Sequence, residues 1–584
     1  MEQPGNGETG GQTLVRTLKR LGVDHIFGLP GDTGMAFYDA LYDEPGIRHI
    51  MTRDERSASF MADVYARVSR RLGVCEGPSG GGATYIVPGV AEAQGSAIPL
   101  LCLTSDTSSR ELNWGVLTEL DQPGLFAPIT KWTERVHHAS AMEEAVIRAA
   151  RMSLSERPGA THLSLPSDAL EERHEKPVRS SGEAHLDRVP TARTRPDATE
   201  VERAARLIAE AKSAVVVAGG GVLTSGAWDE LTAFADATGV PVATSINGKG
   251  AIAETHPASI GVVGNNGARS YANAWVSEAD LLIFLGTRTD STTTWFWTLP
   301  PKHSPPATIH IDVSAREIGN NYPSGAFLLG DAAATLKDLI AAIDHPERLR
   351  EVNQPRLQRL AMEKTEYFER IEREAASDSQ PIKPQRLIRT LRKLLDDDTV
   401  IVADPGTPTP YLAAQYELRR GGRTTVIPRA HGGLGYAIPG VVGAWHAVAD
   451  QGRRVVGVTG DGSFGMSVGE FETISRLNLP IVLIQCSNNT FGWIKELQHL
   501  YHDQRYYSVD FNGVDYVKIA EGFGLAGASV TDPADLESTI QHALASGKPS
   551  FISVVTEPQM TETPPVASWE RTVAARAASE IGNG

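Results

Sequence analysis

Residues 460–489 read GDGSFGMSVGEFETISRLNLPIVLIQCSNN, and this segment carries the strongest signal for the fold. Asp461 comes directly after the apolar run RRVVGVTG (453–460), and Asn488 comes directly after a second apolar run, PIVLIQCS (480–487). Both runs have the length and composition of buried strands, and the amphipathic stretch between them fits a crossover connection. Such a unit makes two parallel strands whose carboxyl ends lie side by side. The sequence therefore predicts that Asp461 and Asn488 meet at one edge of a parallel sheet.

The residues at that edge have the chemistry of a cation and phosphate site. The Asp461 carboxylate, the Asn488 amide oxygen and the Thr490 backbone carbonyl are hard oxygen donors of the kind that bind Mg²⁺ or Ca²⁺. Backbone N–H groups of the glycine turn and of the following helix start would bind a diphosphate. The residues that supply them are Gly460, Gly462 and Ser463. The alternative is that GDG is only a turn and NN only a loop, but both motifs occur together, each directly after a strand.

Composition places the chain among globular proteins. It has 584 residues, with 41% hydrophobic and 22% charged residues, and this length allows about three or four domains. The formal net charge of −16, and the lack of a basic run with interleaved aromatic residues, argue against nucleic-acid binding. Cys75, Cys102 and Cys486 lie in or beside apolar runs, which predicts buried thiols in a reducing compartment.

The sequence carries no signal for export or for a membrane. Its first residues, MEQPGNGETGGQ, contain neither a basic segment nor an apolar one. No later stretch is apolar over the length needed to span a bilayer. We therefore expect a cytoplasmic protein without a membrane partner.

Strand and helix patterns alternate along almost the whole chain, which predicts parallel α/β architecture. Two polar stretches interrupt the alternation, at 171–200 and at about 344–384; the second has the pattern of an exposed helix followed by a linker. These stretches predict three domains, each built on a parallel sheet and covering 10–170, 196–343 and 383–560.

The combination of GDG, spacer and NN resembles the cofactor signature of thiamine-diphosphate-dependent enzymes. MTRDERSASFMADVYAR (51–67) resembles a helix of the acetolactate synthase and benzoylformate decarboxylase group, PITKW (128–132) a segment of acetolactate synthases, and HGGLGYAIPGVVGA (431–444) a loop of benzoylformate decarboxylase. The order of blocks matches as well, which implies a pyrimidine-binding, a central and a diphosphate-binding domain. The resemblance implies thiamine diphosphate and Mg²⁺ as cofactors and a homodimer or homotetramer. It leaves open whether the central domain holds FAD.

The resemblance also assigns roles to single residues. Glu55 matches the glutamate that activates the cofactor through N1′ of its aminopyrimidine; the alternative is one more exposed helix charge. Leu434 matches the residue that bends the cofactor, with a core leucine as the alternative, and the Gly432 carbonyl matches the acceptor of the 4′-amino group. Thr407 is the expected diphosphate contact. His431 is either a catalytic proton donor or carboxylate anchor, or a histidine satisfied by nearby backbone.

The activity implied by the resemblance is that of a transferase or lyase that decarboxylates a 2-oxo acid and joins the resulting enamine to a second carbonyl compound, as acetolactate synthases do. The alternatives are a decarboxylase that releases an aldehyde and a catalytically silent relative that acts as a binding subunit. Two positions depart from acetolactate synthases: Thr118 replaces a side-chain amide and Leu497 a tryptophan. The loop CEGPSGGGAT (75–84) lacks the catalytic histidine of benzoylformate decarboxylase. The sequence names neither donor nor acceptor.

Overall fold

The computed structural model describes residues 7–175 and 184–582. The chain divides into two compact units. The first comprises Met1–Ala192, Pro428–Gly452 and Ser467–Leu479, and the second comprises Arg193–Ile427, Arg453–Met466 and Pro480–Gly584. The first unit thus contains the predicted N-terminal domain together with two segments from the C-terminal part of the chain.

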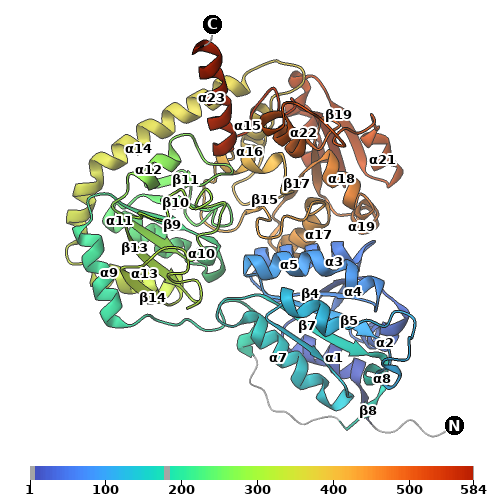
Figure 1. Cartoon of the computed structure of the whole chain (residues 1–584). Helices are drawn as coiled ribbons and strands as arrows, with labels where there is room; N and C mark the ends of the chain where they lie inside the picture. The colour runs from blue at the N-terminus through green and yellow to red at the C-terminus, as the bar shows by residue number, and fades with distance from the viewer. Residues whose placement is uncertain (1–6, 176–183, 583–584) are drawn as a thin grey trace, which may run out of the picture. The chain divides into compact units, whose positions relative to one another are not determined.

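A six-stranded sheet forms the centre of the first unit (Figure 1). Its strands are β2 (His25–Gly28), β3 (Arg48–Met51), β4 (Gly73–Gly77), β5 (Leu100–Asp106), β6 (Trp132–Arg135) and β7 (Ala160–Pro166). They follow the order β3-β2-β4-β5-β7-β6, and every neighbouring pair is parallel. β4, β5 and β7 are buried along their whole length, as expected when helices cover both faces of a parallel sheet.

Helices cover both faces of this sheet. They are α1 (Gly10–Arg20), α2 (Met35–Tyr42), α3 (Glu55–Ser69), α4 (Gly81–Tyr85), α5 (Val87–Ser96), α6 (Gln122–Phe126), α7 (Met142–Leu154), α8 (Ser167–Glu171), α17 (Ala437–Val448) and α19 (Glu470–Arg476). Apolar side chains of α1, α2 and α7 join those of β4, β5 and β7 in one core. Figure 1 shows α3 and α5 on the opposite side, and α17 packs along α3.

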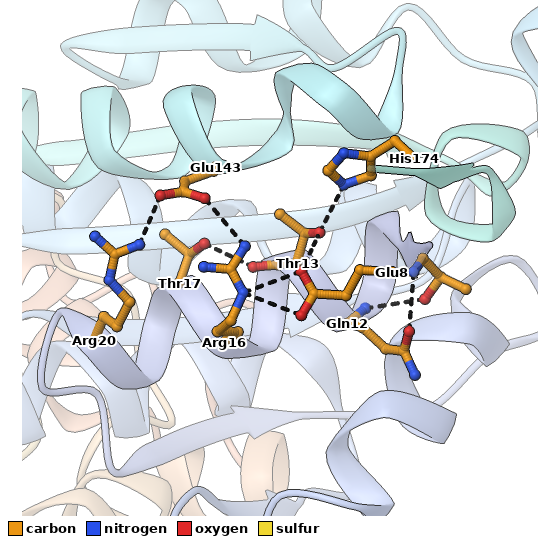
Figure 2. Close-up of polar contacts among 9 residues, drawn as sticks. Glu8, Gln12, Thr13, Arg16, Thr17, Arg20, Glu143 and His174 are labelled. Carbon is orange, nitrogen blue, oxygen red and sulfur yellow. Dashed lines mark hydrogen bonds and ion pairs between the residues drawn. The ribbon is translucent and has the colours of Figure 1, made fainter. Parts of the chain in front are cut away.

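Polar contacts fix α1 along its length (Figure 2). Thr9 and Gln12 form a capping box, in which Oγ1 of Thr9 accepts from the Gln12 N–H at 3.1 Å and Oε1 of Gln12 accepts from the Thr9 N–H at 2.9 Å. Arg16 and Arg20 both donate to Glu143 of α7, at 3.0 and 2.6 Å. Because Glu143 is buried, these charge-assisted bonds tie α1 to α7 in addition to apolar packing. Directly before α1, β1 (Glu8–Thr9) pairs with β8 (Arg173–His174) in a two-residue antiparallel ladder.

The second unit contains two six-stranded parallel sheets. The strands of the first are β9 (Ala214–Ala218), β10 (Val242–Thr244), β11 (Ser259–Val262), β12 (Leu281–Leu285), β13 (Ala307–Asp312) and β14 (Ala326–Leu329), in the order β11-β10-β9-β12-β13-β14. The helices beside it are α9 (Ala198–Glu210), α10 (Gly220–Ser225), α11 (Trp228–Thr238), α12 (Ala272–Ser277) and α13 (Ala332–Ala342). α9, α11 and α13 share one core with this sheet, and α12 packs in a second core on the other face.

The other sheet of this unit carries the GDG and NN motifs. Its strands are β15 (Val400–Ala403), β16 (Thr425–Val426), β17 (Val455–Gly460), β18 (Val482–Ser487), β19 (Ala526–Val530) and β20 (Ser550–Val555). They follow the order β16-β15-β17-β18-β20-β19. If the six strands of each sheet are numbered in chain order, this sheet and the sheet of the first unit both have the order 2-1-3-4-6-5. The chain changes direction between β15 and β17, and open α/β sheets bind ligands at such switch points, beyond the carboxyl ends of the strands.

The helices of this region are α14 (Pro346–Ala375), α15 (Pro384–Leu394), α16 (Pro408–Gln415), α18 (Asp461–Ser467), α20 (Gly492–Tyr501), α21 (Tyr516–Gly522), α22 (Leu536–Ser546) and α23 (Ala567–Gly582). α15, α16 and α22 share a core with one face of the sheet. On the other face, Phe464 of α18 packs against Tyr516 and Phe551. α14 is the mostly exposed helix predicted in the second polar stretch.

The predicted fold class is confirmed, because each of the three large sheets is parallel and is covered by helices. The three cysteines are free and buried, with Cys75 and Cys102 opposite each other on β4 and β5. No helix in the described part of the chain is both long and apolar enough to cross a bilayer.

Candidate active site

The structure brings Asp461 and Asn488 together at the ends of β17 and β18. These strands are parallel neighbours, with Gly460 opposite Cys486 at the end of the ladder. Oδ2 of Asp461 accepts hydrogen bonds from the backbone N–H groups of Asn488 at 2.7 Å and Asn489 at 2.6 Å. The two apolar runs of the sequence therefore place the Asp461 carboxylate beside the backbone of Asn488 and Asn489.

Strand β18 holds the other oxygen of the same carboxylate. Oδ1 of Asp461 accepts from Gln485 Nε2 at 2.6 Å and from Ser487 Oγ at 2.9 Å. Asp461 is 6% exposed, so protein donors rather than solvent stabilise its charge. The amide oxygen of Gln485 is buried and has no partner among the described residues. Gln485 was not among the predicted site residues. A polar side chain within an otherwise apolar strand could have indicated it.

The glycines that flank Asp461 differ in their surroundings. α18 begins at Asp461 itself, so the separate glycine turn expected before the helix does not form, because Gly460 still pairs as the last strand residue. A Cβ on Gly462 would lie 2.3 Å from the Phe491 ring, whereas one on Gly460 meets nothing within 4 Å. Ser463 is buried in the first turn of α18. Gly462 is therefore required by the close approach of the segment that follows β18.

Thr407 follows β15, the strand on the other side of β17. The Thr459 hydroxyl donates to Oδ2 of Asp404 at 2.7 Å and joins the ends of these two strands. Thr407 is half-buried and is the N-cap residue of α16. Pro408 and Pro410 have no N–H group, so this helix start offers fewer backbone donors than usual. Thr407 thus lies at the switch point of the sheet, where its hydroxyl and its backbone N–H are possible donors.

The backbone at Thr490 is fixed on both sides. Asn489, the residue before it, adopts the left-handed conformation with φ of 56°. The Thr490 hydroxyl donates to the Val509 carbonyl at 2.7 Å, and Thr490 pairs with Asp510 in an isolated antiparallel bridge. These contacts fix the backbone at Thr490, whose carbonyl is one of the predicted cation ligands.

Glu55 is the first residue of α3 and belongs to the first unit. It is 6% exposed, and the glycine-rich loop after β4 makes room for its side chain. A Cβ on Gly77 would lie 3.2 Å from Cγ of Glu55, and one on Gly82 would lie 3.0 Å from Oε1. Burial raises the pKa of Glu55; its own backbone N–H acts in the opposite direction, and the carboxylates of Asp54 and Glu76 add to the rise.

Glu76, at the end of β4, forms a polar cluster that sequence analysis missed. Its Oε1 accepts from the Tyr38 hydroxyl and lies 3.1 Å from Nε2 of His49. The Tyr38 hydroxyl and His49 Nε2 are 3.2 Å apart. Burial, followed by the Glu76 carboxylate, raises the pKa of Tyr38. The cluster holds a second carboxylate close enough to Glu55 to act on its pKa.

The loop that carries His431 is anchored by Glu92 of α5. Oε2 of this fully buried carboxylate accepts from the backbone N–H groups of Ala430 at 3.2 Å, His431 at 2.7 Å and Gly432 at 3.2 Å. Arg67 donates to Oε1 at 3.0 Å. Burial alone would raise the pKa of Glu92, but Arg67 and the backbone donors lower it below its usual value. No pattern in the sequence predicts the role of Glu92, because the loop that it binds is so distant in the chain.

Around this anchor the predicted loop residues take different environments. The His431 side chain is exposed, while its backbone N–H is bound by the anchor. Gly432 has φ of 75°, a conformation that favours glycine, and Leu434 is half-buried. A Cβ on Gly433 would lie 3.1 Å from the Phe60 ring of α3. The loop therefore lies against the helix whose first residue is the predicted activating glutamate.

Glu92→Gln is expected to destabilise the first unit. The amide cannot balance the buried charge of Arg67 and offers one acceptor oxygen in place of two, so a loss of about 2–4 kcal/mol is expected. Thermal unfolding followed by circular dichroism measures the effect. Glu44→Gln is the control, because it removes one partner of an exposed ion pair with Lys19. Equal melting temperatures for the two variants would contradict the anchoring role of Glu92.

The predicted site residues fall into two groups. The first unit contains Glu55, His431, Gly432 and Leu434. The second unit contains Thr407, Gly460, Asp461, Gly462, Ser463, Asn488 and Thr490. Within its own unit, each group includes residues that follow the carboxyl end of a parallel strand: β3 in the first unit, and β15, β17 and β18 in the second.

Thr118 and Leu497, the two residues that differ from acetolactate synthases, each pack against residues of their own unit. Oγ1 of Thr118 lies 2.7 Å from Oγ of Ser79, and a Cβ on Gly80 would lie 2.7 Å from the Thr118 Cβ. Thr118 therefore covers the glycine-rich loop closely. Leu497, on α20, packs against a small apolar cluster that includes Trp569.

The chain is similar to known proteins along most of its length. Three family models match successive parts of the chain: the N-terminal TPP binding domain of thiamine pyrophosphate enzymes over residues 8–125, the central domain over 201–339 and the C-terminal TPP binding domain over 404–554. A probable acetolactate synthase large subunit of Methanocaldococcus jannaschii is 32% identical over 94% of this chain and 92% of its own length. An acetolactate synthase of Mycobacterium bovis is 31% identical, over 92% of this chain and 86% of its own length.

A third relative, the acetolactate synthase isozyme 3 large subunit of Escherichia coli, is 29% identical over 92% of each chain. The matches extend over all three sheets rather than over the GDG and NN motifs alone. The chain therefore belongs to the thiamine pyrophosphate enzyme family, as a thiamine-diphosphate-dependent enzyme related to acetolactate synthase large subunits.

Proposed function

We propose that this enzyme uses thiamine diphosphate and Mg²⁺ to decarboxylate a 2-oxo acid and then joins the remaining fragment to a second carbonyl compound. The observation that carries the proposal is the edge where β17 and β18 end on the buried Asp461 carboxylate and on Asn488. The relatedness to acetolactate synthases supports the joining step.

The donor set at this edge fits a hard divalent cation. Asp461, the Asn488 side chain and the Thr490 carbonyl offer only oxygen ligands, which Mg²⁺ prefers. Four protein donors already occupy the Asp461 carboxylate, so the metal ion would replace at least one of them. The Gln485 amide is the donor best suited to turn away, because its own oxygen is buried without a protein partner in the described chain.

The diphosphate would lie beside the metal ion, at the start of α18 and next to Thr407. Backbone N–H groups at Gly460, Gly462 and Ser463 and the Thr407 hydroxyl are the donors that we assign to it. This edge is the switch point between β15 and β17, where ligands of open α/β sheets bind.

For the aminopyrimidine ring of the cofactor, we propose that Glu55 supplies the proton bound at N1′. The raised pKa of Glu55 favours the protonated carboxyl, which can donate to N1′ and so increase the acidity of the neighbouring 4′-amino group. The Gly432 carbonyl would accept from that amino group, and Leu434 would support the bent form of the cofactor. When bound, the cofactor supplies the electron sink for loss of CO₂. His431, whose imidazole is exposed, is assigned to proton exchange with the substrate.

With pyruvate alone, the enzyme is expected to form acetolactate slowly or not at all. Thr118 and Leu497 replace an amide and a tryptophan, and small changes of pocket shape alter discrimination by about 1–3 kcal/mol each. Another donor–acceptor pair is therefore expected to react faster. Mass spectrometry of products from a panel of 2-oxo acids, with and without aldehyde acceptors at saturating cofactor, measures this. Acetolactate synthesis that exceeds every other pair would show that the two replacements carry no weight.

Simple decarboxylation is the second candidate, supported by the form of the GGLGYAIP loop (432–439). It predicts that the panel yields only aldehydes, whatever the acceptor. A catalytically silent binding subunit would retain no thiamine diphosphate on purification. The presence of Glu55, Asp461 and Asn488 together, and the similarity to acetolactate synthase large subunits, argue against that alternative.

We further propose a cytoplasmic homodimer or homotetramer that acts on small molecules and not on nucleic acid or a membrane. The ranges 10–170, 196–343 and 383–560 are assigned as its pyrimidine-binding, central and diphosphate-binding domains. Sedimentation velocity tests the assembly. The visible absorbance spectrum of the purified protein decides whether the central domain holds FAD.

A further inference from the structure

Gln559 is a buried side-chain amide that stands outside the residues assigned so far. It follows β20, in the segment that leads to α23, and is 1% exposed. Within residues 7–175 and 184–582, neither Nε2 nor Oε1 has a hydrogen-bond partner. A buried amide is costly when both its polar atoms are unpaired, so this one points to a ligand that completes its bonding.

Because Gly492 has no side chain, a small space remains beside the Gln559 amide. Gly492 is the first residue of α20, and a Cβ there would lie 3.0 Å from Oε1 of Gln559 and 3.3 Å from Oγ1 of Thr407. The amide and the hydroxyl therefore approach the same small volume, which any larger residue at position 492 would fill.

This volume adjoins the site at the ends of β15, β17 and β18. Phe491, which precedes Gly492, packs its ring on Gly462 of α18. Thr407 is the residue that caps α16 directly after β15. Gln559 therefore borders Gly492. Gly492 and its neighbour Phe491 lie against Thr407 and Gly462, two of the residues that we assign to the diphosphate.

Backbone donors are scarce on the Thr407 side of this volume. Pro408 and Pro410 have no N–H, and the Thr409 N–H donates to the Gly406 carbonyl at 3.0 Å. Beyond the Thr407 N–H, an anionic ligand at this helix start therefore depends on side-chain donors. The Thr407 hydroxyl and the Gln559 amide are two side-chain donors that the geometry brings together there.

We infer that Gln559 binds the diphosphate of thiamine diphosphate, with Nε2 donating to a phosphate oxygen that Thr407 also contacts. This inference rests on the proposed function. A half-turn about the last side-chain torsion exchanges the positions of Nε2 and Oε1, so the amide is able to direct its N–H groups toward Thr407. Thiamine without phosphate cannot make this contact, so the contribution of Gln559 is specific to the phosphorylated cofactor.

The experiment compares Gln559→Ala with Gln415→Ala, a matched control at the far end of α16. Gln415 is also buried and also has an amide oxygen without a partner among the described residues. Isothermal titration with Mg²⁺ present gives the Kd for thiamine diphosphate and for thiamine. Thermal unfolding without cofactor reports any structural damage. If Gln559→Ala fails to fold, Gln559→Met, which keeps the length of the side chain, takes its place.

Gln559→Ala is expected to weaken thiamine diphosphate binding by roughly tenfold to a hundredfold, as loss of one hydrogen bond to a charged group predicts, while thiamine binding stays unchanged. Without cofactor, its melting temperature should equal or exceed that of the unsubstituted protein, because an unpaired amide has been removed. Gln415→Ala should bind both ligands normally. Unchanged diphosphate affinity in Gln559→Ala, or equal weakening for thiamine, would overturn the inference. Failure of the unsubstituted protein to bind thiamine diphosphate would instead overturn the proposed function.

Discussion

Asp461→Ala is expected to abolish retention of thiamine diphosphate while the protein stays folded. The carboxylate is the one anionic ligand that we assign to Mg²⁺, and four donors from β18 and the segment after it fix its position. Losing an outer-shell partner of a metal site costs about 10–100-fold in metal affinity, so the loss of this ligand should cost more. Equilibrium dialysis with labelled thiamine diphosphate, with and without Mg²⁺, measures the change.

The control for this substitution is Asp503→Ala, which removes an exposed carboxylate of the same unit. Chelation of divalent cations should reproduce the Asp461→Ala result in the unsubstituted protein and in the control. If a folded Asp461→Ala variant binds the cofactor as tightly as the control does, the metal site has been assigned to the wrong residues.

Glu55→Gln is expected to slow cofactor activation without preventing cofactor binding. The amide keeps the shape of the side chain but removes the titratable proton that we place at N1′. Hydrogen–deuterium exchange at C2 of the bound cofactor, followed by NMR after acid quench, should slow by about 10²–10⁴-fold. The thiamine diphosphate Kd should change little.

Asp43→Asn is the control for Glu55→Gln, because it makes the same kind of exchange of carboxylate for amide at an exposed residue of the same unit. Its exchange rate should stay close to that of the unsubstituted protein. An exchange rate for Glu55→Gln within a factor of about two of the unsubstituted protein would remove Glu55 from the mechanism.

The parts of the site that follow strands directly could be predicted from the sequence. Asp461 and Asn488 each come immediately after an apolar run, and the carboxyl ends of parallel neighbours must lie together, so their proximity follows from topology alone. The parallel sheets were predictable for a similar reason, because strand and helix patterns alternate with few interruptions.

The supporting contacts could not be predicted, because they join residues that no local pattern connects. Glu92 binds a loop 338–340 residues away, and its selection depends on how α5 and the loop pack. Gln559 and Thr407 are likewise distant in the chain, yet both border the space beside Gly492. Lys131, in the PITKW segment, is a further example, because its Nζ donates to the carbonyls of Ser155 and Arg157, both at 2.9 Å.

Product analysis with an isotope-labelled donor shows whether the enzyme makes a carbon–carbon bond after decarboxylation. A 2-oxo acid labelled at its keto carbon is incubated with the enzyme, thiamine diphosphate, Mg²⁺ and an unlabelled carbonyl acceptor, and the products are identified by mass spectrometry. We expect a product that contains the labelled carbon joined to the acceptor, and we expect Asp461→Ala not to form this product. If the label is found only in the aldehyde, across every acceptor tried, the enzyme does not join the two fragments.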